Sequence, residues 1–184
     1  MIPDYDRAAR MAYKTLLALH IESLPVDPLQ ILSFCKNTVV HSYEELMNRM
    51  GETNYSDFKY YYMENKDALT IRKQFDNGQI GYEIYYDNRG YYCRRRFTLG
   101  HELGHVILRH SSEEWWEEKE ADYFASQLLA PHPIIQILPS LDKNSVAHLF
   151  SLSKAATEMA LRKPIHNPDQ EIYTQIKKQF AYVI

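Results

Sequence analysis

The sequence has few cysteines, and this scarcity limits how the chain can be held together. Its two cysteines, Cys35 and Cys93, lie far apart and form no CxxC pair. A disulfide framework is therefore not indicated, and a reducing cytoplasmic location fits best. The first residues also lack a basic segment followed by an apolar core, so we expect no signal peptide.

An excess of positive charge is missing as well. The chain has 21 basic and 24 acidic residues, a net charge of -3 and an isoelectric point of about 6.2. This balance gives no electrostatic reason to expect nucleic acid or an anionic membrane as the main partner. No apolar run approaches the roughly 20 residues that would span a bilayer, so we expect no membrane partner either.

The middle of the chain is rich in tyrosine and is predicted to form a small antiparallel sheet. Most of the 15 tyrosines lie between Tyr55 and Tyr92, and partly alternating tyrosines are typical of half-buried strands, although they also occur on partner-binding surfaces. The pattern predicts strands over residues 68–73 and 80–86, joined by a turn at Asp76-Asn77-Gly78. A shorter strand is predicted over residues 38–41.

Helical periodicity and capping residues predict the other elements. Asp27 and Ser42 are suited to cap helices, and Gly51 is suited to end the second of these. Ser111 or Ser112 is expected to cap a later helix, which ends before Pro131. The sequence thus predicts an α+β fold with helices over residues 4–21, 28–35, 43–50, 112–130, 144–150, 154–162 and 169–182, and with a further helix that begins at about residue 96.

The segment around residue 101 contains the pattern H-E-x-x-H, formed by His101, Glu102 and His105. On a helix the two histidines lie one turn apart on the same face, so their ring nitrogens can bind one zinc ion. Glu102 lies beside them and can take a proton from a zinc-bound water. Gly104 lacks a side chain where another segment can approach closely, despite its cost in a helix.

A catalytic zinc usually takes three protein ligands, so a further ligand is needed. An acidic helix follows the motif directly, and a short link lets the two helices pack side by side. Its glutamates can also be read as a solvated helix start that favours the helix dipole. That reading does not account for all of them, because the next turns of the helix have a clear core face, formed by Ala121, Phe124, Ala125, Leu128 and Leu129.

Together, RRRFTLGHELGHVILRH and the following EKEADYFASQLLAP resemble the ImmA/IrrE family of metallopeptidases. The resemblance implies a thermolysin-like zincin core, a cytoplasmic bacterial or phage setting, and cleavage of a DNA-binding repressor. It also implies that His101, His105 and Glu118 bind Zn2+, that Glu102 is the catalytic base, and that Asp122 holds a ligand histidine. On this reading residues 1–140 are a zinc metallopeptidase domain, and residues 141–184 are a C-terminal helical extension in the same globule.

Helix geometry favours Glu118 over Glu120 as the third ligand. The two are about 200° apart around a helix, so both cannot face one ion. Glu118 and Asp122 are four residues apart on one face, so one can reach the metal while the other orients a histidine. Glu120 is then expected to face solvent or to pair with Lys119 or Arg109.

Other residues near the motif receive weaker expectations. The strand around Tyr82 and Tyr85 is expected to edge the cleft, with these tyrosines in contact with substrate or with the developing oxyanion. His110, about 140° around the helix from His105, is expected to point away from the zinc. The basic run Arg94-Arg95-Arg96 is read as a solvated flank.

The tail offers a rival function, because residues 146–156 resemble a helix-turn-helix with Ser151 at the turn. Its second helix would present Lys154, Thr157 and Glu158 to a DNA groove. The overall acidity and Glu158 argue against DNA binding. The alternatives to a zinc endopeptidase are a non-catalytic regulator that binds a repressor or DNA, and a toxin–antitoxin component. The sequence does not fix the substrate, the cleavage site, the activation trigger or the oligomeric state.

Overall fold

The structure of the chain is a computed structural model that describes residues 1–62, 66–74, 78–112, 114–138, 141–162, 164–167 and 169–182. The turn predicted at Asp76-Asn77 lies outside these residues. The described part has an α+β fold of three strands and ten helices. The strands are β1 (Thr38–Ser42), β2 (Ala68–Gln74) and β3 (Ile80–Tyr86), and the helices are α1 (Tyr5–Ala18), α2 (Pro28–Ser33), α3 (Tyr43–Met50), α4 (Glu52–Tyr62), α5 (Tyr92–Leu108), α6 (Trp115–Leu129), α7 (His132–Ile135), α8 (Lys143–Phe150), α9 (Lys154–Ala160) and α10 (Gln170–Gln179).

Helix ends that were predicted from capping residues agree with the structure. Asp27 accepts a hydrogen bond from the Leu29 N–H at the start of α2. Ser42 and Glu45 form a reciprocal capping box at the start of α3, and Gly51 ends that helix with a φ of 77°. The exception is α6, whose N-cap residue is Glu114 and not Ser111 or Ser112.

The sheet is mixed, so the prediction of an antiparallel sheet is only partly correct. The strand order is β1-β3-β2, with β3 antiparallel to β2 and parallel to β1. The β2–β3 hairpin joins neighbouring segments, so the alternating sequence pattern predicts it. The pairing of β1 with β3 is long-range, because α3, α4 and β2 lie between them in the chain. The middle position of β3 leaves β1 and β2 as the edge strands, and among the described residues no strand pairs with the outer side of β2.

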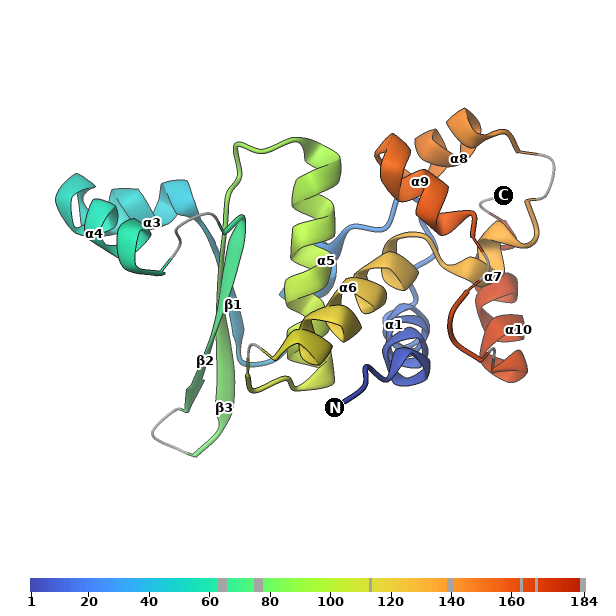
Figure 1. Cartoon of the computed structure of the whole chain (residues 1–184), viewed down its shortest axis with the longest axis horizontal. Coiled ribbons are helices and arrows are strands. Elements are labelled where there is room, and N and C mark those ends of the chain that lie inside the picture. Colours follow the sequence, from blue (N-terminus) through green and yellow to red (C-terminus); the bar gives the residue numbers. More distant parts are fainter. Residues whose placement is uncertain are drawn as a thin grey trace.

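The two faces of the sheet pack against different helices (Figure 1). Ile84 of β3 faces α5 and is fully buried in the main core. On the other face, α3 and α4 pack against one end of the sheet through a second, smaller cluster of Tyr43, Leu46, Tyr55 and Tyr85. Tyr55 lies in α4, a helix that the sequence analysis did not predict, so part of the tyrosine-rich segment is helical.

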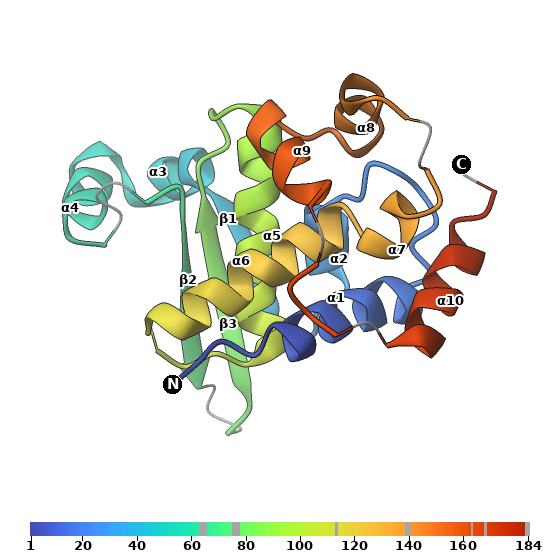
Figure 2. The ribbon, with the colours of Figure 1, turned by 45° about the vertical axis from the view of Figure 1, so that its right-hand side comes forward.

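Beyond α5, the helices α6 and α1 form the next layer, and the C-terminal helices pack against it (Figure 2).

The segment that resembles a helix-turn-helix is formed by α8 and α9, and Ser151 joins them in the left-handed conformation. Thr157, which was expected to face a DNA groove, is buried and donates a hydrogen bond to the Ser153 carbonyl oxygen, so it cannot do so. The division of the chain into a peptidase domain, residues 1–140, and a C-terminal extension, residues 141–184, stays a prediction. In the described part of the chain, no helix is long and apolar enough to cross a membrane.

Arg96 lies inside the protein and not on a solvated flank, which corrects the expectation for the basic run. Its side chain is 3% exposed and donates hydrogen bonds to the carbonyl oxygens of Val26, Phe150 and Ser151, at 2.7 to 3.2 Å. Burial lowers the pKa of the Arg96 guanidinium. This one side chain therefore joins α5 to the segment before α2 and to the end of α8.

Replacing Arg96 should destabilise the protein strongly. In Arg96→Met the three buried carbonyl groups lose their donor, and we expect the free energy of unfolding to fall by about 3 kcal/mol. Arg94 provides the matched control, because its side chain is 68% exposed and pairs with Asp67 at the surface. Arg94→Met should cost less than about 1 kcal/mol. Urea denaturation measures both, and equal midpoints for the two variants would contradict the structural role of Arg96.

Candidate metal centre

Two closely packed helices carry the H-E-x-x-H motif and the acidic segment. A Cβ atom added to Gly104 would lie 3.1 Å from the Cα atom of Ala121, and one added to Gly100 would lie 3.3 Å from the Cβ atom of Ala125. Side chains at these positions would hold α5 and α6 apart. The expectation that Gly104 permits a close approach is therefore confirmed.

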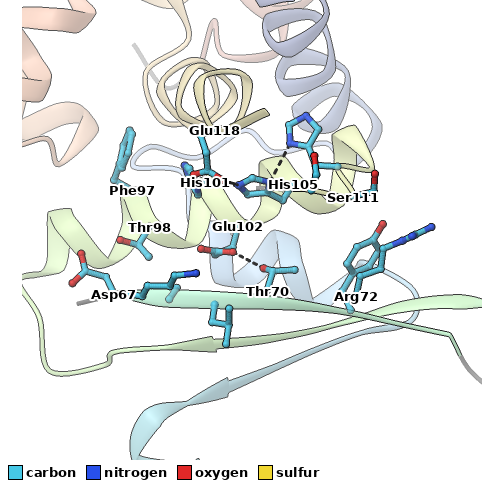
Figure 3. Close-up of a pocket in the computed structure, with 16 residues that line it drawn as sticks. Asp67, Thr70, Arg72, Phe97, Thr98, His101, Glu102, His105, Ser111 and Glu118 are labelled. Atoms are coloured by element: carbon cyan, nitrogen blue, oxygen red, sulfur yellow. Dashed lines mark hydrogen bonds and ion pairs between the residues drawn. The ribbon is translucent and has the colours of Figure 1, made fainter. Parts of the chain in front are cut away.

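His101, His105 and Glu118 meet between these two helices (Figure 3). The Nε2 atoms of the two histidines are 3.0 Å apart. The Glu118 carboxylate lies 3.3 Å from Nε2 of His101 and 3.4 Å from Nε2 of His105. Two imidazole nitrogens and one carboxylate oxygen are a donor set that zinc takes in catalytic sites, so these residues fit the metal that the motif implies.

Each histidine also has a partner at its other ring nitrogen. The Nδ1 atom of His101 lies 3.0 Å from Asp122, as the sequence analysis expected of a residue that holds a ligand. The Nδ1 atom of His105 lies 3.1 Å from Nδ1 of His110. Such partners fix the tautomer and the orientation of a metal-binding ring.

The position of His110 differs from the expectation that it points away from the site. That expectation continued the helix beyond His105, but α5 ends at Leu108 and Arg109 has a φ of 57°. The chain therefore turns back, and His110 is buried against His105. No helical angle computed from the sequence applies past the end of the helix.

The surroundings of His101 and His105 shift the pKa values of the two side chains in opposite directions. Burial opposes a charge on His101, but hydrogen bonds with Asp122 and Glu118 raise its pKa to about 10. Burial and the neighbouring His101 lower the pKa of His105 to about 4. The hydrogen bond from His101 holds the pKa of Glu118 below its usual range. The carboxylates of Asp122 and Glu118 therefore favour one positive charge on the histidine pair, at His101, and a second charge at His105 is disfavoured.

Glu102 lies next to this cluster but points to the sheet. Its side chain accepts a hydrogen bond of 2.5 Å from Oγ1 of Thr70 on β2, and it is 8% exposed. Burial raises its pKa, and the bond from Thr70 only partly offsets this. A carboxyl group with a raised pKa is suited to take up a proton and release it again near neutral pH.

A cleft of about 670 Å³ opens over these groups, between β2 on one side and the start of α6 on the other (Figure 3). Its wall on the β2 side runs from Lys66 to Arg72, and its floor is the face of α5 that carries His101 and Glu102. The reacting groups are thus open to a ligand that lies along the first part of β2, from Ala68 to Arg72.

The two tyrosines that were expected to bind substrate lie in different places. Tyr82 lines the cleft. Tyr85 points to the other face of the sheet, where it packs in the smaller cluster and bonds to Glu83 at 2.7 Å. The expectation that β3 edges the cleft is wrong, because β3 is the central strand and pairs on both sides. Of the two edge strands, β2 is the one that lines the cleft.

Glu120 does not face solvent and does not pair with Lys119 or Arg109, which corrects the sequence expectation. It is 2% exposed and bonds to Arg7 at 3.1 Å and to the backbone N–H of Asp4 at 2.8 Å. The reason is that α1 packs over this face of α6. Lys119 instead contacts Asp122 at 3.4 Å.

The comparisons with known proteins agree with this site. The family described as the IrrE N-terminal-like domain, a peptidase family, matches residues 55–162, which include β2, β3, α5 and α6. No curated protein and no solved structure matches the chain. The match covers more than half of the chain and contains both helices of the candidate metal centre.

Proposed function

The chain belongs to the peptidase family of the IrrE N-terminal-like domain, and from this premise we propose that it is a zinc-dependent endopeptidase. The observation that carries the proposal is the convergence of His101, His105 and Glu118 on one point, with Glu102 beside it in an open cleft. A zinc ion held by these three residues would acidify a coordinated water and polarise the scissile carbonyl group.

The other steps fall to residues of the chain itself. Glu102 accepts the proton of the attacking water and delivers it to the amine that leaves when the peptide bond breaks. Thr70 holds the Glu102 carboxyl group in place between these two transfers. Asp122 keeps the Nδ1 hydrogen of His101 on the side away from the metal.

The substrate is proposed to bind as an extended segment along β2. This strand has a free edge and forms one wall of the cleft, so a peptide can pair with its backbone. The resemblance of the two motifs to repressor-cleaving peptidases leads us to propose a helix-turn-helix repressor as the protein substrate. A repressor encoded by a neighbouring gene is the substrate to assay first.

Cleavage of an unstructured peptide by the zinc-loaded protein should depend on alternate backbone amides. In a strand every second N–H points to the same neighbour, so N-methylation of every second amide should raise KM, and methylation of the amides between should change it little. Steady-state kinetics on a series of singly methylated peptides measures this pattern.

A chelator provides the control for the same assay, since cleavage should stop when zinc is removed and return when zinc is restored. Cleavage that persists in the metal-free protein would contradict the proposed function. Equal KM values across the methylated series would contradict only the docking on β2.

A further inference from the structure

A series of buried contacts leads from His105 to the first helix of the chain. Nδ1 of His105 lies 3.1 Å from Nδ1 of His110, whose Nε2 atom lies 3.2 Å from the Glu120 carboxylate. Glu120 accepts hydrogen bonds from Arg7 at 3.1 Å and from the backbone N–H of Asp4 at 2.8 Å. His110 is only 6% exposed and Glu120 only 2%, so water cannot replace these contacts freely.

The hydrogen positions in this series follow from Glu120. Its two oxygens accept from a guanidinium and from a backbone N–H, so in this cluster of donors Glu120 is the acceptor of the contact with His110 as well. Nε2 of His110 must then carry the hydrogen of that contact. Only one hydrogen fits between Nδ1 of His105 and Nδ1 of His110. A neutral His110 that carries its hydrogen on Nε2 has none on Nδ1, so the hydrogen belongs to Nδ1 of His105. The Nε2 atom of His105 then has a free lone pair, and this atom faces His101 and Glu118.

We propose that Arg7, Glu120 and His110 are positioning residues that fix the tautomer and the orientation of His105, an inference that rests on the metal centre proposed above. The two histidines are then supported differently. His101 donates to the carboxylate of Asp122, whereas His105 donates to a neutral imidazole. A carboxylate acceptor raises the basicity of a ligand more than an imidazole does, so His101 is the stronger donor to the metal.

Arg7 connects this support to a helix outside the matched family domain. It lies in α1, and its second guanidinium nitrogen donates to the carbonyl oxygen of Leu108, the last residue of α5. One side chain thus contacts both the end of the motif helix and the carboxylate on α6. Helix α1 is therefore a part of the metal centre and not only of the core.

The test compares zinc affinity in variants of His110. His110→Phe keeps the ring volume but removes the acceptor for the His105 N–H, so zinc should bind about 10–100-fold more weakly. His110→Asn places an amide oxygen near the position of Nδ1 and should retain most of the affinity. Competition with a chromophoric chelator measures the dissociation constants, and the visible spectrum of the cobalt-loaded protein reports the ligand geometry independently of activity.

His166 provides a matched control, because it is also 6% exposed but bonds to Tyr123 and Tyr173, away from the motif helix. His166→Phe should leave the zinc affinity and the cobalt spectrum unchanged. Arg7→Met tests the far end of the series at a position where the side chain is 43% exposed. Because the buried Glu120 carboxylate loses a partner in this variant, its circular dichroism spectrum is checked before zinc is titrated. We expect it to lower zinc affinity in the same direction as His110→Phe, by a smaller factor.

Three results are distinguishable. Weaker zinc binding and an altered cobalt spectrum in His110→Phe, with recovery in His110→Asn, would support the inference. Wild-type affinity and spectrum in His110→Phe would overturn it and leave the proposed function intact; if that variant does not fold, unchanged affinity in Arg7→Met would overturn it. A wild-type protein that binds no zinc would overturn the metal centre itself.

Discussion

The Glu102→Gln variant should bind zinc as tightly as the wild type and hydrolyse peptides at least about 100-fold more slowly. The amide has nearly the same shape as the carboxyl group and can still bond to Thr70, so the packing beneath the cleft is kept. It cannot take up a proton from water. Because Glu102 is not one of the three residues that meet at the metal point, zinc content should stay at about one ion per chain.

The control for this experiment is Glu83→Gln on the opposite face of the sheet. Glu83 pairs with Lys73 at 2.6 Å and bonds to Tyr85, and it does not line the cleft. Its variant should cleave peptides at the wild-type rate. Wild-type turnover in Glu102→Gln would end the proposed mechanism, whereas a slow Glu83→Gln would show that any change in the sheet lowers the rate.

Glu118→Ala should mainly weaken metal binding, and Glu120→Ala should mainly lower stability. Glu118 is 41% exposed and meets the two histidines, so its loss should weaken zinc binding by more than the roughly 10–100-fold that supporting residues contribute. The fold should change little. Glu120 is buried and bonds to Arg7, so its loss should lower the free energy of unfolding clearly and weaken zinc binding less.

Zinc titration and urea denaturation of both variants measure the two effects. If Glu120 faced solvent, as the sequence predicted, Glu120→Ala would change little; its contacts with Asp4 and Arg7 are the reason to expect a loss of stability. A larger loss of zinc affinity in Glu120→Ala than in Glu118→Ala would contradict the assignment of Glu118 as ligand. Equal stability of the two variants would contradict the burial of Glu120.

Local chemistry accounts for what the sequence predicts well. The spacing of His101 and His105 determines that both rings lie on one face of a helix, whatever packs around it. The same holds for Glu118 and Asp122, which both reach His101 from one face of α6. Capping residues such as Ser42 act within four residues, so they mark helix ends reliably.

Long-range packing accounts for most of what the sequence does not predict. The pairing of β1 with β3 joins segments about 40 residues apart, and no local pattern specifies it. The burial of Arg96, in contrast, had a signal in the sequence. Arg96 shares the helix face of Leu99 and Leu103, so its burial follows from the 3.6-residue period. Charge alone was a poor reason to place it in solvent.

The close contact between Gly104 and Ala121 has a thermodynamic consequence for the protein's response to zinc. This contact holds α5 and α6 together by direct packing, so the proposed ligand residues are brought together when the protein folds, before any metal binds. A zinc finger, in contrast, needs its ion in order to fold. Zinc bound at the proposed centre would add stability only by mass action, about 2.7 kcal/mol when its free concentration is 100 times Kd. We therefore expect zinc supply to set the fraction of active protein without setting the amount of folded protein.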